Sequence, residues 1–324
     1  MEFSNFSLLV TCYNKEPYVQ GFCDIADVFL LNGGAIVLVD DGSTDDSYSA
    51  LEYLGDTNTK FKLIRTENLG SASARNLTLK HLETEFFMFW DIDDLVDLKS
   101  ISEVFDGFKN SDSQIAVTNY ISIPGDQYGS MPLKVTDKKI VEIGECRSQI
   151  LDSMGYWRYM YRKSVIIDNY GMRFIPTRQE LNNSNFILDD LFWMMEIASL
   201  NGMILVYPHN QITYKYRTNQ VQSDAAWQRY INQVLDIPAA LLAFEKYMKV
   251  KEFNLFSVRK KLYLLMLRKH FSYLSKKQRL EFFVNFAKMG KFDSKLRLMT
   301  APLAYCLVID MLSLLRMKLR RSPT

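Results

Sequence analysis

The sequence predicts an α/β fold with a Rossmann-like, mostly parallel sheet flanked by helices, followed by a helical C-terminal segment. In the first hundred residues, short apolar runs typical of buried strands alternate with segments whose apolar residues recur at helical spacing. From about residue 224 onward, helical spacing continues with few strand signals. Because strands that alternate with helices form βαβ units, we expect a parallel sheet covered on both faces.

The first two strands can be placed from their apolar runs. The first, 6–13 (FSLLVTCY), is followed by Pro17, which with its neighbours opens a helix towards Leu31. The second, 35–40 (AIVLVD), is followed by GSTDDS, whose hydroxyl and acidic side chains are typical helix N-caps. We expect the helix after this segment to reach about Leu54.

The third and fourth strands complete the predicted parallel sheet of the first hundred residues. The third, 61–65 (FKLIR), leads through TENLGSASARN into a helix that ends near Leu82. The fourth, 86–90 (FFMFW), runs without any turn residue into a group of acids. In sheets of this kind, ligands bind beyond the carboxyl ends of the strands, so the polar residues at these ends are the candidates for a site.

Acidic side chains crowd at the end of the fourth strand, in FWDIDDL. Acids at such a position repel one another and cost desolvation, so they need a positive partner. Carboxylates suit Mg²⁺ or Mn²⁺, which shares its other ligands with substrate phosphates. We therefore expect Asp91, Asp93 and Asp94 to face solvent at the sheet edge, with a metal that carries a diphosphate as their partner.

Composition narrows the class of protein. The 324 residues carry 39 basic and 37 acidic side chains, a net charge of +2, so we expect no nucleic-acid partner. The four cysteines form no CxxC pair, and the N-terminus shows no secretory signal, which favours a reducing, cytoplasmic location. Neither GxGxxG after the first strand nor GxxxxGK[ST] is present, which argues against dinucleotide redox enzymes and P-loop NTPases.

Four motifs carry a family resemblance: TCYNKEPYV, VDDGSTDDS, ENLGSASARN and FWDIDDL. In this order and at these separations, they resemble the nucleotide-sugar-binding half of family 2 glycosyltransferases of the GT-A fold, over about residues 6–110. The resemblance implies a GT-A domain over 1–223, with a nucleotide-binding half over 1–110 and an acceptor half over 111–223. A helical extension over 224–324 would follow.

The resemblance also assigns roles to residues of the first half. Tyr13 resembles the residue that stacks on the base and Asp41 the carboxylate that reads the uracil edge, which favours UDP over GDP or dTDP. Arg75 resembles the basic residue that lies near the diphosphate. The implied nucleotide-binding residues are Thr11, Tyr13, Asp41, Arg75, Asp91 and Asp93, and the implied ligands of Mn²⁺ or Mg²⁺ are Asp93 and Asp94.

A second acidic pair stands in NFILDDLFWMMEIASL, ahead of an amphipathic helix. It resembles the family's ED segment, with Asp189 where Glu is usual, and Asp190 resembles the catalytic base. Inverting transfer needs a carboxylate that accepts the acceptor's proton while a metal stabilises the departing diphosphate. The structural alternative is that both acids cap the helix that begins at Leu191.

Two later segments supply candidates for the acceptor side and for a loop. Trp157, in SMGYWRYMYRKSVI, resembles part of the segment that lines the acceptor side, where its ring could stack on a sugar, although burial in the core is the alternative. Arg217, in YKYRTNQVQS, stands where the family has a loop that closes over the donor. With Lys215, it is a candidate for contact with the diphosphate.

The C-terminal stretch 301–321 predicts contact with a membrane surface. Asp310 interrupts it, and basic residues follow, so it reads as an amphipathic helix on an anionic membrane rather than a spanning helix. The alternative is a helix packed on its own domain.

Together these features predict an inverting, metal-dependent transferase that moves a sugar from a UDP-sugar to a hydroxyl of a growing, lipid-linked or other surface glycan. We expect it to be cytoplasmic and peripheral on the inner face of the cell membrane. The alternative is a catalytically silent module of the same fold that binds a sugar nucleotide or a glycan. A nucleotidyltransferase is disfavoured because a Gly-rich, basic loop after the first strand is missing.

Overall fold

The computed structural model describes residues 1–125, 127–129, 133–152, 155–174, 177, 179 and 189–218. The strands are β1 (Phe6–Cys12), β2 (Ala35–Asp40), β3 (Phe61–Arg65), β4 (Phe86–Asp91), β5 (Leu95–Val96), β6 (Ile115–Val117), β7 (Asn119–Ile123), β8 (Gln127–Tyr128), β9 (Lys139–Glu142), β10 (Tyr159–Arg162), β11 (Met203–Val206) and β12 (Ile212–Arg217). The helices are α1 (Glu16–Leu31), α2 (Ser47–Thr57), α3 (Ser71–Lys80), α4 (Leu98–Lys109), α5 (Arg147–Asp152) and α6 (Asp189–Ser199), with short helical turns η1 (Ile143–Glu145), η2 (Tyr156–Arg158) and η3 (Ser164–Asn169).

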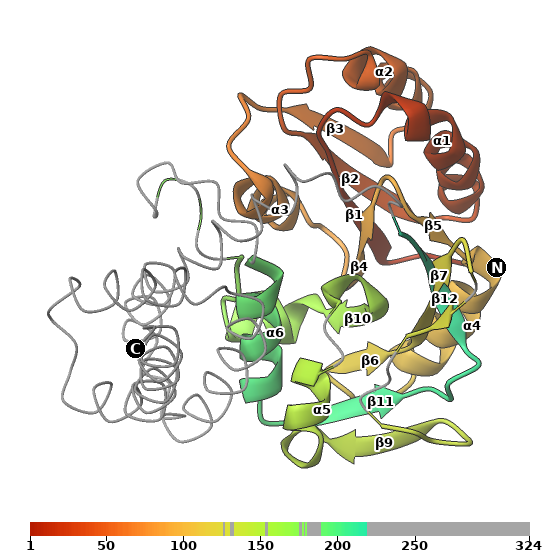
Figure 1. The fold of residues 1–324 in the computed structure, drawn as a ribbon, viewed down its shortest axis with the longest axis vertical. Helices are drawn as coiled ribbons and strands as arrows, with labels where there is room; N and C mark the ends of the chain where they lie inside the picture. The colour runs from red at the N-terminus through yellow and green to blue at the C-terminus, as the bar shows by residue number, and fades with distance from the viewer. Residues whose placement is uncertain are drawn as a thin grey trace, which may run out of the picture. The chain divides into compact units, whose positions relative to one another are not determined.

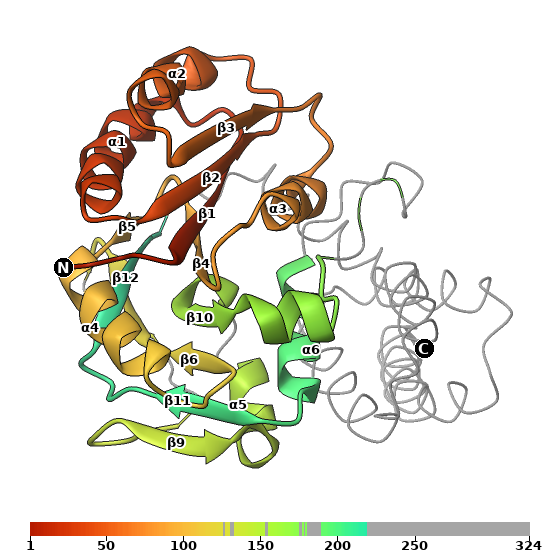
Figure 2. The ribbon, with the colours of Figure 1, turned by 180° about the vertical axis from the view of Figure 1, so that it is seen from behind.

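The first half of the fold confirms the predicted βαβ arrangement. Strands β1 to β4 pair in parallel in the order β3-β2-β1-β4. Helices α1 and α2 lie on one side of these strands and α3 lies on the other (Figures 1 and 2). The register pairs Thr11 with Val39 on one side and with Asp91 on the other, so the carboxyl ends of the three strands lie level.

Beyond β4, the sheet is mixed rather than parallel. Strand β10 pairs antiparallel with both β4 and β6, β11 pairs in parallel with β6, and β9 pairs antiparallel with β11. The resulting order, β3-β2-β1-β4-β10-β6-β11-β9, sets a later strand directly against β4. Residues of the predicted acceptor half therefore border the end of β4.

Aromatic packing holds α6 against this part of the sheet. The ring of Trp193 stacks on that of Phe174, with centroids 4.4 Å apart, and meets Phe89 of β4 edge to face at 5.5 Å. The indole N–H of Trp193 donates a hydrogen bond to the hydroxyl of Tyr161 on β10, at 3.1 Å. Because these side chains are fully buried, the position of α6 relative to β4 is set by core packing.

A second sheet, with strand order β5-β12-β7-β8, closes over the acids that follow β4. Strand β5 begins directly after Asp94, and its Val96 and Leu95 pair antiparallel with Tyr214 and Lys215 of β12. The end of β12 is thus held beside the acidic loop.

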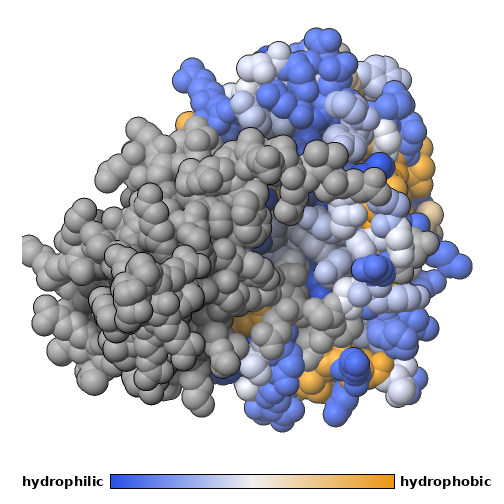
Figure 3. Space-filling view, viewed as in Figure 1, coloured by the Kyte–Doolittle hydropathy of each residue, from blue (hydrophilic) through white to orange (hydrophobic). Residues whose placement is uncertain are grey.

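In Figure 3, the described surface over α2 is mostly hydrophilic.

Several predictions lie outside the described residues. These are the domain boundary at 223, the helical extension over 224–324 and the amphipathic stretch 301–321. No helix in the described ranges is both long enough and apolar enough to cross a membrane.

Candidate active site

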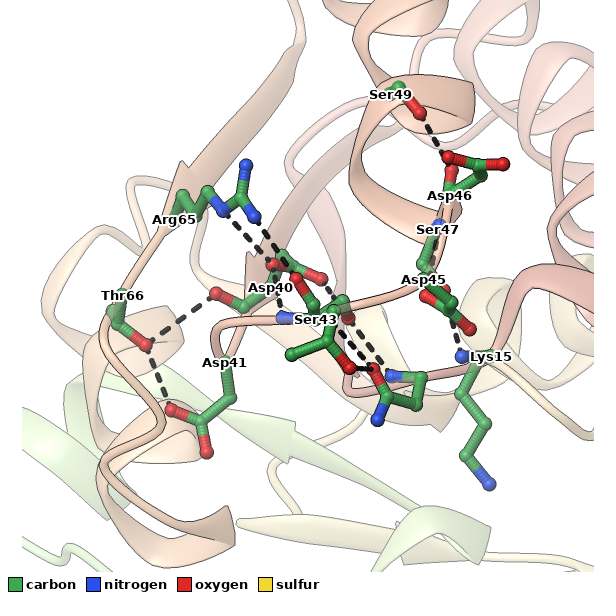
Figure 4. A network of polar contacts seen from close by, with 12 residues as sticks. Lys15, Asp40, Asp41, Ser43, Asp45, Asp46, Ser47, Ser49, Arg65 and Thr66 are labelled. Atoms are coloured by element: carbon green, nitrogen blue, oxygen red, sulfur yellow. Dashed lines mark hydrogen bonds and ion pairs between the residues drawn. The ribbon is translucent and has the colours of Figure 1, made fainter.

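The loops that follow β1 and β2 are joined by hydrogen bonds between side chains and backbone. Asp40, fully buried at the end of β2, accepts hydrogen bonds from the backbone N–H of Ser43, at 3.0 Å, and from its hydroxyl (Figure 4). The Ser43 hydroxyl accepts from the backbone N–H of Asn14 at 2.9 Å, and the Asn14 side chain accepts from the N–H of Thr44 at 2.8 Å. The chain's own hydrogen bonds therefore join the two loops, and such preorganisation lowers the entropic cost of binding a ligand.

The two residues predicted to contact the base differ in exposure. Tyr13, the predicted stacking residue, is 43% exposed at the end of β1. Asp41 is 6% exposed, and its carboxylate accepts hydrogen bonds from the hydroxyl of Thr66 at 2.8 Å and from the backbone N–H groups of Leu69 and Gly70 at 2.6 and 2.8 Å. Asp41 therefore orders the loop before α3, a role that the sequence did not predict. Its contact with a uracil edge stays a prediction.

Asp94 does not face solvent, which corrects the expectation for the acidic cluster. Its side chain is 4% exposed, because β12 covers it. One carboxylate oxygen accepts a hydrogen bond from the hydroxyl of Tyr214 at 2.8 Å, and the other accepts from the backbone N–H of Arg217 at 2.6 Å. Burial nevertheless raises the pKa of Asp94 to about 7. Asp94 therefore links the acidic loop to the end of β12.

Asp91 and Asp93 are partly exposed and have positive neighbours from the chain itself. The hydroxyl of Tyr156 donates to the Asp91 carboxylate, at 2.9 and 3.1 Å from its two oxygens, and a guanidinium nitrogen of Arg75 lies 3.7 Å away. Burial raises the pKa of Asp91, although Arg75 opposes this shift. Asp93 forms an ion pair with Lys15. In this structure, the positive partners of the acids are thus Lys15 and Arg75.

A divalent cation fits this loop only as a partner of a bound diphosphate. Within the described ranges, no three His, Cys, Asp or Glu side chains converge as a metal-binding group. Asp93 is partly exposed and pairs with the ammonium of Lys15, whereas both oxygens of Asp94 already accept hydrogen bonds. Mg²⁺ commonly uses one or two carboxylates and completes its shell with phosphates and water. The residues therefore fit a shared cation at Asp93 better than a preformed metal cage.

The predicted base lies beside this loop, at the start of α6. A guanidinium nitrogen of Arg75, on α3, lies 2.7 Å from the fully buried carboxylate of Asp189. The Ser71 hydroxyl donates to the other Asp189 oxygen at 3.3 Å. Asp190, the next residue, is partly buried in the first turn of the same helix. Arg75 therefore connects Asp91 with the helix that carries the predicted base.

Trp157 packs in an aromatic cluster rather than presenting a free ring face. It is 8% exposed, and its ring stacks on Tyr214 at 4.2 Å and on Tyr216 at 5.7 Å between centroids. Tyr120 meets it edge to face at 4.8 Å. Of the two alternatives for Trp157, these contacts favour burial. Its contact with an acceptor sugar stays untested.

Arg217, at the end of β12, and Lys15, in the loop before α1, approach the same aromatic ring. The guanidinium of Arg217 lies 5.5 Å from the centroid of the Tyr18 ring, and the ammonium of Lys15 lies 5.8 Å from it. The buried Nε of Arg217 has no hydrogen-bond partner in the part of the chain that the structure describes. Two cations therefore lie near the ring of Tyr18, and one of them, Lys15, is paired with Asp93.

Sequence reasoning missed three residues of this site: Lys15, Tyr156 and Tyr214. Lys15 follows the first strand within a motif that was already singled out, so its position was available as a signal. Tyr156 and Tyr214 come from segments 65 and 123 residues away from Asp91. No local pattern marks either of them as partners of the acids.

Comparisons with known proteins agree with this geometry. A model of "Glycosyl transferase family 2" matches residues 7–171. The teichoic acid poly(glycerol phosphate) polymerase of Staphylococcus epidermidis is 34% identical over 115 residues, 35% of this chain and 16% of that protein. The poly(ribitol-phosphate) beta-N-acetylglucosaminyltransferase TarS of Staphylococcus aureus is 26% identical over 218 residues, 66% of this chain and 36% of that protein. This chain thus spans well under half the length of either relative.

Solved structures share the fold. The crystal structure of S. aureus TarS 1-349 in complex with UDP-GlcNAc superposes with a TM-score of 0.57 at 17% identity, covering 87% of this chain and 84% of that one. The mannosyltransferase PcManGT of Pyrobaculum calidifontis, in complex with GDP-Man and Mn²⁺, gives a TM-score of 0.52 at 14% identity, covering 95% and 81%. The strand order confirms the predicted GT-A type of sheet, and with the matched residues 7–171 it shows that the chain belongs to glycosyl transferase family 2.

Proposed function

We propose that this chain is an inverting glycosyltransferase that moves a sugar from a UDP-sugar to a hydroxyl of a surface glycan, with Mn²⁺ or Mg²⁺. Membership of glycosyl transferase family 2 supports sugar transfer. The similar TarS structure holds UDP-GlcNAc, and TarS is named for a poly(ribitol-phosphate) acceptor, which supports a UDP-sugar donor and a polymeric acceptor here.

The observation that carries the proposal is the meeting of two acidic segments through one arginine. Arg75 lies 2.7 Å from Asp189 and 3.7 Å from Asp91, so the first turn of α6 borders the acids that follow β4. Displacement at an anomeric carbon needs a base on one side and stabilisation of the leaving group on the other. Asp190 and Asp93 are carboxylates in positions suited to these two tasks.

Each side chain then has a defined task. Tyr13 stacks on the base, Asp41 is oriented towards its edge, and Asp91 accepts from the ribose hydroxyls. Asp93 would hold the divalent cation, which, when bound, would stabilise the negative charge of the departing diphosphate. Asp190 accepts the proton of the attacking hydroxyl.

The rest of the proposal concerns the acceptor and the location of the protein. We propose a glycan or lipid-linked glycan acceptor, a GT-A domain over 1–223 and an extension over 224–324 that contacts an anionic membrane surface. The basic residues after 301–321 support this contact. The protein would then act in the cytoplasm, on the inner face of the membrane.

The test begins with nucleotide binding. The purified chain is titrated calorimetrically with UDP, GDP and dTDP, each in Mn²⁺ and in EDTA. Of the three nucleotides, only UDP should bind tightly, and only in Mn²⁺. Asp93→Ala should abolish the metal dependence. Absence of binding of all three nucleotides to folded protein would contradict the proposal.

The second step separates an enzyme from a silent binding module. Asp190→Asn should lower the rate of UDP release at least a hundredfold, measured with the nucleotide sugar that the wild type uses as a substrate. The UDP dissociation constant should stay within about threefold of the wild-type value. Asp106→Asn, on the exposed Asp106–Lys109 pair of α4, serves as the matched control and should change neither quantity. Unchanged turnover in Asp190→Asn would remove Asp190 as the base, and UDP binding without any turnover by the wild type would favour the silent module.

A further inference from the structure

Arg75 is held by the protein rather than presented to a ligand. Its side chain is 13% exposed, and its guanidinium lies over the rings of Tyr156 and Phe174, at 4.6 and 5.4 Å from their centroids. One guanidinium nitrogen lies 2.7 Å from the Asp189 carboxylate. A guanidinium with two ring contacts and a short carboxylate contact has little freedom to turn towards a diphosphate.

The pairing also explains how Asp189 can be buried. A carboxylate with no exposed surface is costly unless an opposite charge and hydrogen bonds compensate it. Arg75 supplies the charge, and the Ser71 hydroxyl supplies a further hydrogen bond at 3.3 Å. Both partners lie on α3, so the start of α6 depends on α3 for its position.

A second, independent contact joins the same two helices. The side-chain amide of Asn76, the residue after Arg75, donates to the carbonyl of Phe174 at 2.8 Å and accepts from its N–H at 2.7 Å. The ring of Phe174 stacks on Trp193 of α6. Helix α3 thus holds α6 at its first turn through Asp189 and one turn later through Phe174.

We propose that Arg75 and Asp189 act together as positioning residues: their ion pair fixes the first turn of α6, and hence Asp190, relative to Asp91 at the donor site. This inference rests on the proposed function, and it gives Arg75 a role other than the one implied by the resemblance, a basic residue near the diphosphate. It makes two mechanistic claims. The pair should affect turnover rather than nucleotide binding, and the two residues should act as one unit.

The experiment compares Arg75→Met, Asp189→Asn and the double variant with the wild type and with Asp106→Asn. For each, the UDP dissociation constant is measured by calorimetry with Mn²⁺. The kcat for UDP release is measured with the best substrate among UDP-GlcNAc, UDP-glucose and UDP-galactose. The double variant leaves neither charge buried alone, so it should fold even if Arg75→Met does not.

We expect kcat to fall at least tenfold in Arg75→Met, in Asp189→Asn and in the double variant, while the UDP dissociation constant stays within threefold of the wild-type value. The kcat of the double variant should be no lower than that of the slower single variant. Three results would overturn the inference: UDP binding weakened tenfold by Arg75→Met, unchanged kcat in Asp189→Asn, or single effects that multiply in the double variant. If Arg75→Met is unfolded, the same limits are applied to Asp189→Asn and the double variant. A wild type that neither binds UDP nor turns over a UDP-sugar refutes the proposed function itself, which distinguishes the two failures.

Discussion

Replacing the Asp94 carboxyl group with an amide should make the stability of the protein less dependent on pH. Asp94 is buried, and burial raises its pKa from an ordinary 3.8 to about 7. Between these two values, the folded state keeps a proton that the unfolded state releases. The free energy of unfolding of the wild type therefore falls as the pH rises through this window.

The size of the effect follows from the pKa difference. A rise from 3.8 to about 7 corresponds to roughly 4 kcal/mol over the whole window, and to about 2–3 kcal/mol between pH 5 and pH 8. In Asp94→Asn, the amide oxygen can still accept from the N–H of Arg217, and the amide nitrogen can donate to the hydroxyl of Tyr214, which can accept a hydrogen bond. The variant should therefore exceed the stability of the wild type by about 1–2 kcal/mol at pH 5 and by roughly 4 kcal/mol at pH 8, so that the difference widens by about 2–3 kcal/mol between the two pH values.

Urea unfolding at pH 5 and pH 8 measures this difference, with EDTA present so that no metal binds the acids. Tryptophan fluorescence follows the unfolding, and one of the four tryptophans, Trp90, lies at the site, where its indole N–H donates to the backbone carbonyl of Asp94 at 3.2 Å. Asp94→Ala is the informative contrast, since it leaves the Tyr214 hydroxyl and the Arg217 N–H without their acceptor. The free energy of unfolding should fall by about 1–3 kcal/mol for each of these two donors. Parallel pH dependence in the wild type and Asp94→Asn, or a loss of stability in Asp94→Asn at pH 8, would refute the reasoning.

Three further predictions follow from individual contacts. Lys15→Met should tighten Mn²⁺ binding about fivefold in the presence of UDP, because Mn²⁺ no longer competes with an ammonium for Asp93. Electron paramagnetic resonance of free Mn²⁺ measures this binding, and weaker binding would contradict the competition. Gly42→Ala should cost about 1–3 kcal/mol in urea unfolding, since φ is +77° and a Cβ would lie 2.7 Å from the backbone nitrogen of Asn68; an unchanged midpoint would argue against this close approach. Trp157→Ala should cost roughly 3–5 kcal/mol from loss of its stacked cluster, and intact stability with lost turnover would instead support a role at the acceptor.

The first half of the fold was predictable because its signals are local. The bounds of β2 and β3 coincide with the apolar runs 35–40 and 61–65, and α1 begins one residue before Pro17. Each strand is a short apolar run, and Pro17 marks the start of α1, so neighbouring residues suffice to define these elements. The level carboxyl ends of the strands then follow from parallel pairing.

The environment of the acids could not be predicted in the same way. Asp91, Asp93 and Asp94 are alike in the sequence, yet one is bonded to Tyr156, one is paired with Lys15 and one is buried under β12. Lys15 comes from the loop after β1, whereas the contacts of Asp91 and Asp94 come from η2 and from the second sheet. These are contacts between segments far apart in the chain, and apolar periodicity carries no information about which strands become neighbours.

Asp189 and Asp190 show how such a long-range contact can divide tasks between two identical residues. Adjacent residues of a helix point about 100° apart, so the two carboxylates meet Arg75 differently: Asp189 forms the short contact, whereas Asp190 acts on Arg75 through its charge. Arg75 engages Asp189, whose buried oxygens accept from a guanidinium at 2.7 Å and from a hydroxyl at 3.3 Å. The Asp189 carboxylate is thus occupied by contacts within the protein, and the same contacts hold the helix that presents Asp190. This division of contacts favours Asp190 over Asp189 as the base.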